Sequence, residues 1–78
     1  MVRTELVVDS KWVQGFPPLM PRQVEVKVEP DEVAEVRSAA AAGDLFVRMD
    51  TPDGERVQVA NLWFNPHDHT RITCILAA

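Results

Sequence analysis

Hydrophobic and polar residues alternate most regularly between Gln23 and Glu29, where the sequence reads QVEVKVE. An extended chain carries the valines on one side and the charged residues on the other: Val24, Val26 and Val28 against Glu25, Lys27 and Glu29. This period of two is typical of a half-buried strand. A shorter run, Glu5 to Asp9 (ELVVD), predicts a second strand with Leu6 and Val8 on one face.

The next segment carries the signals of a helix over about residues 30–42. Pro30 suits the first helical position, acidic residues follow it in the first turn, and Gly43 supplies the stop. The apolar stripe of this helix is narrow and made of small side chains: Val33, Val36 and Ala40. Such a helix can cover only one face of a sheet.

Two β-prone runs, 44–50 and 55–64, flank the turn sequence Thr51-Pro52-Asp53-Gly54 and predict a hairpin closed by the loop 52–54. The corresponding register pairs apolar residues on one face and polar residues on the other: Met49 with Val57 and Val47 with Val59, then Asp50 with Arg56 and Arg48 with Gln58.

The same register predicts an apolar outer face farther from the turn. It sets Phe46 opposite Ala60, with Leu62 and Phe64 following on that side, and it turns Asn61 and Trp63 toward the core. A last strand, 71–76 (RITCIL), has Ile72, Cys74 and Leu76 on one face and Ile75 on the other. Four of these residues therefore form an apolar patch that needs a cover, which the helix cannot provide: Phe46, Leu62, Phe64 and Ile75.

An apolar loop, residues 10–22, precedes these elements. Its three prolines and one glycine exclude a regular helix or strand, yet it carries large apolar side chains: Trp12, Phe16, Leu19 and Met20. The loop can fold over the second sheet face as a lid, or a second chain can bury the patch, the loop or both. The two arrangements are compatible with each other.

These elements predict one α+β domain over residues 1–78. It has a curved antiparallel sheet of four to five strands, one helix at about 30–42, and the Pro-rich apolar loop 10–22. A chain of 78 residues that is 46% hydrophobic is too short for two cores and too apolar for disorder. A domain this small gains stability from assembly, so we expect a homodimer or larger species.

Charge and apolar run lengths narrow the choice of partners. A net charge of −4 disfavours nucleic acid as a partner. No apolar run reaches the roughly 18 residues of a membrane span, so no membrane partner is predicted. The single Cys74 and an N-terminus without a long apolar stretch predict a cytoplasmic protein.

The residues that could carry chemistry are few. His67 and His69 lie two residues apart and could chelate zinc, with Cys74 or Asp68 as a third ligand. Asn65-Pro66 and Asp68 equally fit a polar turn with solvent-facing histidines, and Ile72 and Leu76 favour Cys74 as a core residue. No glycine-rich phosphate loop or nucleophile elbow is present, so we predict neither a cofactor nor a metal.

The sequence therefore favours a small non-enzymatic protein-binding or regulatory module that associates with itself. The alternative is a small metal-dependent or thiol enzyme centred on His67, His69 and Cys74. The passage from Val24 to Phe64 resembles a general strand, helix and hairpin module of many small bacterial and phage proteins, without functional residues to transfer. The candidate partner-binding residues are those of the loop and of the sheet patch: Trp12, Phe16, Leu19, Met20, Phe46, Leu62, Phe64 and Ile75.

Overall fold

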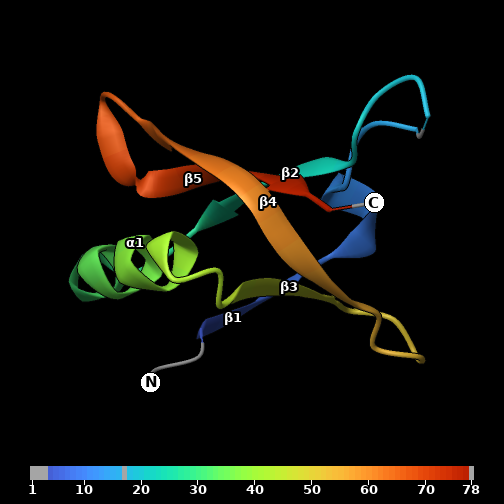
Figure 1. The fold of residues 1–78 in the computed structure, drawn as a ribbon, viewed down its shortest axis with the longest axis horizontal. Helices are drawn as coiled ribbons and strands as arrows, with labels where there is room; N and C mark the ends of the chain where they lie inside the picture. The colour runs from blue at the N-terminus through green and yellow to red at the C-terminus, as the bar shows by residue number, and fades with distance from the viewer. Residues whose placement is uncertain (1–3, 17, 78) are drawn as a thin grey trace.

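The computed structural model describes residues 4–16 and 18–77, which form a curled five-stranded sheet and one helix (Figure 1). The strands are β1 (Thr4–Val8), β2 (Gln23–Lys27), β3 (Leu45–Met49), β4 (Arg56–Asn65) and β5 (Asp68–Leu76). Their order in the sheet is β1-β3-β4-β5-β2. The expected α+β fold with a curved sheet is confirmed. One pairing departs from the expected antiparallel pattern, because β1 runs parallel to β3.

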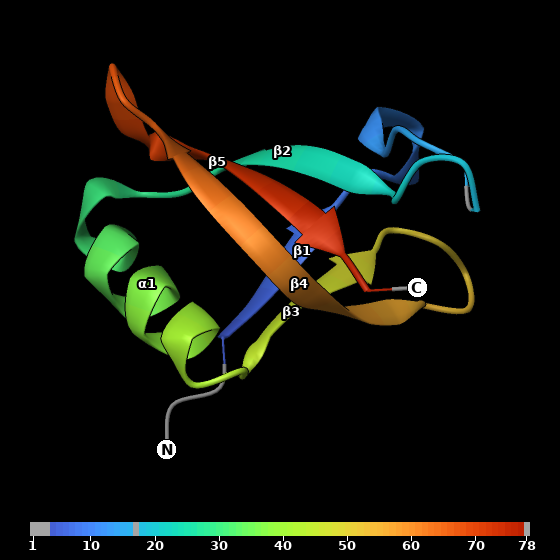
Figure 2. The ribbon, with the colours of Figure 1, turned by 45° about the horizontal axis from the view of Figure 1, so that its top comes forward.

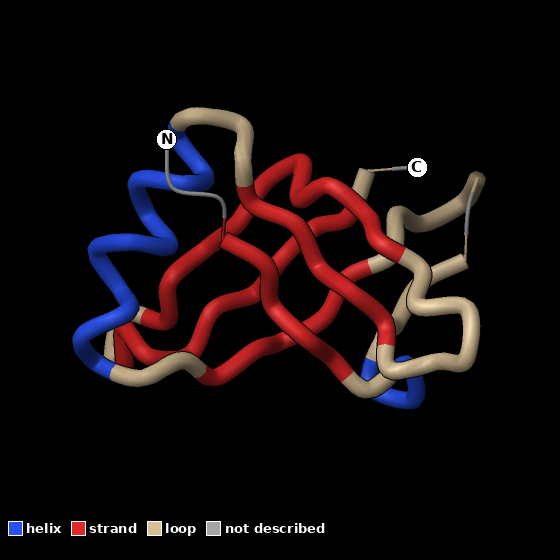
Figure 3. Tube along the Cα trace, turned by 90° about the horizontal axis from the view of Figure 1, so that it is seen from below, coloured by secondary structure: helices blue, strands red, loops and turns tan. Residues whose placement is uncertain are grey.

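The core lies inside the curl of the sheet, where edge strands β1 and β2 come into contact. All five strands and the helix contribute side chains to it, and the most deeply buried large ones are Leu45, Ile72, Val36, Val47 and Cys74. The helix lies across one end of the curl (Figure 2). The tube seen from below shows the helix at one end of the sheet and the long loop at the other (Figure 3).

The helix begins and ends where the sequence predicts. A single 3-10 turn, Pro30–Glu32, leads into α1 (Val33–Ala41), and the backbone N–H of Glu29 donates to Glu32 Oε1 at 3.0 Å in a capping box. Gly43 has φ +74°, a conformation that ends helices and favours glycine. The expected stripe is confirmed in part, since Val36 is buried, Val33 and Ala40 are partly buried, and Ala39 joins them.

The predicted register of the β3–β4 hairpin is wrong by two residues. Val47 lies opposite Val57 instead of Val59, and the N–H of Met49 donates to the carbonyl of Glu55 at 2.7 Å. The reason is tertiary, because the actual register sets Arg48 opposite Arg56, and Glu5 of β1 bonds to both guanidinium groups and so stabilises this pairing of like charges. The turn is therefore longer than expected, although each residue keeps its face because the shift is even.

A β-bulge in β4 changes the faces beyond Ala60. Val59 pairs with Leu76 and Asn61 with Ile75, so Ala60 is the extra residue. Because one extra residue reverses the alternation, Leu62 and Phe64 pack against the core. Asn61 and Trp63 are exposed instead of facing the core. The prediction that Asn61 and Trp63 face the core, with Leu62 and Phe64 on the outer face, is therefore wrong.

Candidate interaction surface

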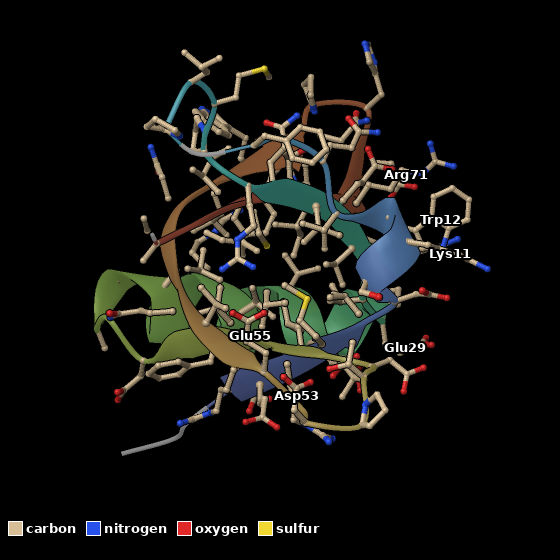
Figure 4. All side chains as sticks on the ribbon, turned by 90° about the vertical axis from the view of Figure 1, so that its right-hand side faces the viewer. Lys11, Trp12, Glu29, Asp53, Glu55 and Arg71 are labelled. Carbon is tan, nitrogen blue, oxygen red and sulfur yellow. The ribbon has the colours of Figure 1, made fainter. Side chains whose placement is uncertain are left out.

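The loop between β1 and β2 exposes its large apolar side chains to solvent. Leu19 is 92% exposed, Phe16 85%, Trp12 64% and Met20 56%. Trp12 and the neighbouring Lys11 point away from the body of the molecule (Figure 4). The prediction that this loop folds across the sheet as a lid is therefore wrong within the described residues. The physical reason is that the curl and the bulge already pack Leu62 and Phe64 against the core, while Arg56 covers Phe46 on the outer face.

Backbone contacts hold the base of the loop in place. Gln14 and Gln23 exchange two hydrogen bonds, of 2.8 and 2.7 Å, which add a one-residue bridge to the edge of β2. Gly15 has φ +97°, and a Cβ there would overlap the carbonyl oxygen of Pro21. Only glycine allows this close approach. The exposed tip is thus carried on an ordered base.

Two more contacts join the loop to the rest of the molecule. Val13 packs against the core from the start of the loop. At the other end, the guanidinium of Arg22 donates to both carboxylate oxygens of Glu55, at 3.3 and 3.4 Å. This ion pair ties the loop to the turn between β3 and β4, at the end of the molecule opposite α1 (Figure 1). The apolar tip therefore projects from a fixed end of the domain.

Trp12 also borders a hollow on the outer face of β2 and β5. The hollow has a volume of about 480 Å³ and is lined by Trp12, Gln14, Gln23, Val24, Glu25 and Thr73. Thr73 pairs with Glu25 on one side and with Trp63 on the other, and Trp63 is 55% exposed. Two exposed indoles thus flank a mostly polar strip of sheet. Exposed tryptophans are unusual in a free surface and common in protein interfaces.

The predicted sheet patch is not one continuous exposed surface. Leu62 and Phe64 pack against the core, and the guanidinium of Arg37 lies 4.6 Å from the centre of the Phe64 ring. Phe46 remains on the outer face but is half-buried under Arg56, whose guanidinium lies 3.9 Å from the ring centre. Ile75 is half-buried on the outer face of β5. The loop, and not this patch, is the main exposed apolar surface.

A charged cluster explains how β1, β3 and β4 fit together on that outer face. The actual register sets Arg48 directly opposite Arg56, which repel each other. Glu5 bridges them from β1, with Oε1 2.8 Å from Arg48 Nε and Oε2 2.7 Å from Arg56 Nε. The hydrogen bond from Arg56, supported by the one from Arg48, lowers the pKa of Glu5 below its ordinary value of 4.5.

The two histidines and the cysteine do not form one site. His67 lies in the turn between β4 and β5, where its N–H donates to Asn65 Oδ1 at 2.8 Å, and His69 is exposed at the start of β5. Cys74 is buried five residues farther along β5, a distance of about 16 Å on an extended strand. Burial raises the pKa of its thiol to about 11, which disfavours the reactive thiolate.

The turn near the histidines is stabilised by its own polar groups. Asp68 Oδ1 accepts hydrogen bonds from both the hydroxyl and the backbone N–H of Thr70, and the hydroxyl bond is the main cause of a lowered pKa of Asp68. Throughout residues 4–16 and 18–77, no cluster of three or more His, Cys, Asp or Glu side chains has the arrangement of a metal site. In the same ranges no helix has the length and apolarity needed to cross a membrane.

Two exposed apolar residues escaped the sequence prediction. Val7 is 56% exposed on the outer side of β1, as its place between Leu6 and Val8 implies, but nothing marked it as part of a surface. Trp63 was assigned to the core. The run Leu62-Trp63-Phe64 is apolar throughout, so it contains no alternation that could reveal the bulge at Ala60.

The fold and the surface define a small α+β protein with a curled mixed sheet and a projecting apolar loop. Comparisons with protein families, curated proteins and solved structures found no match for the chain.

Proposed function

We propose that the chain is a small non-enzymatic protein-binding module whose main contact surface is the apolar tip of the loop 10–22. The observation that carries this proposal is the exposure of Trp12, Phe16, Leu19 and Met20 on a loop whose base is held by backbone hydrogen bonds. Burial of such side chains is favourable at about 25 cal/mol per Å² of apolar surface. A protein surface with an apolar recess is the partner that this tip fits.

The order of the loop base supports binding over accidental exposure. A preformed loop loses less conformational entropy on association than a flexible one, so more of the burial energy appears as affinity. The acidic residues Asp53 and Glu55 line the same hollow as Phe16 and Met49. They form a polar border beside the apolar tip, an arrangement typical of interfaces.

We place the module in the cytoplasm and propose that it associates with itself or with another protein. The buried, unpaired thiol of Cys74 is compatible with a reducing compartment. The described residues give no geometry that favours the metal or thiol enzyme centred on His67, His69 and Cys74, and we do not propose it.

The test is a comparison of association by the unaltered chain and by Leu19→Asp and Phe16→Asp. Sedimentation velocity over a roughly hundredfold concentration range measures self-association. A photo-crosslinking residue at position 19 identifies a different partner by the peptide to which it becomes attached. Because a carboxylate at the tip must be desolvated in the complex, we expect each variant to bind at least about tenfold more weakly.

Ala34→Asp is the matched control, since Ala34 is exposed on α1 at the opposite end of the molecule. It should leave association unchanged. If both loop variants associate as strongly as the unaltered chain, the loop is not the contact surface and the proposal fails. Circular dichroism of all three variants checks that each one folds.

A further inference from the structure

One row of side chains crosses the outer face of the sheet from β2 to β4. Glu25 of β2 pairs with Thr73 of β5, and Thr73 pairs with Trp63 of β4. Because directly opposed residues point to the same face, these three side chains stand next to one another. Trp12 lies beside Glu25, since the backbone bridge at the loop base brings residues 12–14 alongside β2, and both side chains line the same hollow. An indole therefore stands at each end of the row.

Both indoles are open to solvent. Trp12 is 64% exposed and Trp63 55%. The Nζ of Lys11 lies 5.6 Å from the centre of the Trp12 ring, a cation–π contact that restricts this indole without burying it. Neighbouring strands lie about 4.8 Å apart, which puts the backbones of the two tryptophans on the order of 14 Å apart. The face thus offers two aromatic rings at a separation that the sheet sets.

The floor between the indoles is polar. A hollow of about 480 Å³ reaches from Trp12 to Thr73, and its polar lining consists of amide, carboxylate and hydroxyl side chains: Gln14, Gln23, Glu25 and Thr73. In the part of the chain that the structure describes, none of these four side chains is in a hydrogen bond or ion pair with another residue. Their donors and acceptors are available to a ligand.

This arrangement of groups fits a saccharide better than a protein. The centre of a protein interface is apolar and its rim is polar, whereas here the apolar groups stand at the ends and the polar groups lie between them. A pyranose ring has C–H groups on its faces, which are attracted to the negative face of an indole. It has hydroxyl groups around its edge, which bond to amides and carboxylates. A short chain of such rings therefore satisfies both parts of the row.

The charges near the row favour a neutral ligand. The cations beside it interact with acidic side chains: Lys11 Nζ lies 3.5 Å from Asp9 Oδ2, and Asp68 interacts electrostatically with both Lys27 and Arg71. A carboxylate stands within the row itself, and the chain has a net charge of −4. Phosphate groups and acidic sugars are repelled by such a surface.

We infer that the outer face of β2, β5 and β4 binds a neutral oligosaccharide of β-linked pyranose rings. One ring stacks on Trp12 and another on Trp63, and the carboxylate of Glu25 accepts hydrogen bonds from hydroxyl groups between them. Equatorial β-linkages keep such a chain extended along the row, whose length roughly matches a trisaccharide. The inference goes beyond the proposed function, because Trp12 is the one residue of the exposed loop tip that takes part.

Tryptophan fluorescence tests the site directly, because Trp12 and Trp63 are the two tryptophans of the chain. The probes are cellotriose and triacetylchitotriose, which are neutral β-linked trisaccharides. At least one of them should change the emission of the unaltered chain in a saturable way. Maltotriose, whose α-linkages curve the chain, should bind at least about tenfold more weakly than that probe.

Variants locate the bound saccharide. Trp12→Ala and Trp63→Ala should each weaken binding at least about tenfold, with the remaining tryptophan as the reporter, and Trp63→Phe should lose less because a ring remains. Glu25→Ala leaves both reporters in place and should also weaken binding. Phe16→Ala is the matched control, since Phe16 is an aromatic residue that is 85% exposed at the loop tip and does not line the hollow. It should bind like the unaltered chain.

The outcomes separate this site from the alternatives. The inference fails if neither β-linked trisaccharide gives a saturable change, or if the tryptophan and Glu25 variants bind normally. Equal binding of maltotriose overturns the assignment to an extended chain. Binding of oligothymidine in place of the saccharides assigns the face to single-stranded nucleic acid and overturns the inference.

The loop proposal is tested apart from the saccharide site. Leu19→Asp should leave saccharide binding unchanged even where it abolishes association with a protein. Trp63→Ala should leave that association unchanged. If Trp63→Ala weakens the association and no saccharide binds, the sheet face is a protein contact and the inference is wrong.

Discussion

At the scale of single residues, Glu5 shows why the outer face could not be worked out from the hairpin alone. Arg48 and Arg56 face each other across β3 and β4, and both bond to the one carboxylate that β1 supplies. The pairing of β1 with β3 therefore changes the electrostatics of the neighbouring hairpin. Arg56 also covers Phe46, so the same cluster shields an aromatic ring.

We predict that Glu5→Gln destabilises the fold in a pH-dependent way. The pKa of Glu5 is lowered in the folded chain, so its stabilising effect is present above 4.5, its ordinary value. It is lost as the pH falls through the folded-state pKa. Urea unfolding should show Glu5→Gln less stable than the unaltered chain at pH 7, with the difference vanishing in acid.

Glu35→Gln, which removes a carboxylate from an exposed position on α1, controls for the loss of one negative charge. A difference between Glu5→Gln and the unaltered chain that stays constant from neutral to acidic pH would show that the ion pairs with Arg48 and Arg56 do not stabilise the fold.

At the scale of elements, the loop 10–22 and the bulge in β4 decide which apolar side chains reach solvent. The bulge at Ala60 turns Leu62 and Phe64 inward and Trp63 outward. The close approach of Gly15 to Pro21 holds the base of the loop. Each feature depends on the position of one small residue, and each rearranges large side chains nearby.

We predict that Gly15→Ala disrupts the loop base and costs about 2–3 kcal/mol of stability, because a Cβ meets the Pro21 carbonyl and the φ is positive. Gly54→Ala is the matched control. Gly54 also has a positive φ, +59°, but no atom lies within 4 Å of an added Cβ, so only the backbone strain of about 1 kcal/mol applies. Urea unfolding measures both.

Hydrogen exchange locates the effect of Gly15→Ala. The amides of Gln14 and Gln23 should lose protection, since they form the bridge at the loop base. Equal costs for Gly15→Ala and Gly54→Ala, with the bridge still protected, would contradict the role assigned to the Gly15–Pro21 contact.

At the scale of the whole molecule, the curl of the sheet provides the enclosure that a flat sheet would have lacked. Edge strands β1 and β2 approach each other, α1 closes one end, and the core fills the interior. Such a small domain has one core and a small net stability, so each deeply buried side chain contributes a large share.

We predict that Ile72→Ala costs about 2–5 kcal/mol and leaves little folded protein, because Ile72 is 0% exposed at the centre of β5. Ile75→Ala, at a half-buried position on the other face of the same strand, should cost about 1 kcal/mol. Chemical denaturation of both variants measures the two losses of stability. Equal losses would contradict the placement of Ile72 in the core and Ile75 outside it.

Much of the fold follows from the sequence because its causes are local. The strict alternation of residues 23–29 sets β2 and its buried face, and Pro30 and Gly43 delimit the helix. Alternation in RITCIL likewise assigns Ile72, Cys74 and Leu76 to the core. Sequence reasoning also singled out the apolar loop and its four large side chains.

The tertiary structure decided the rest, because the causes lie far apart in the chain. The hairpin register sets Arg48 opposite Arg56, and this pairing depends on Glu5 of β1, which no local turn rule contains. The exposure of Trp63 depends on a bulge within a continuous apolar run, and the exposure of the loop on a sheet that curls over its own core. Local pattern thus fixed which residues are strand, helix or loop, whereas long-range pairing fixed which apolar groups remained for a partner.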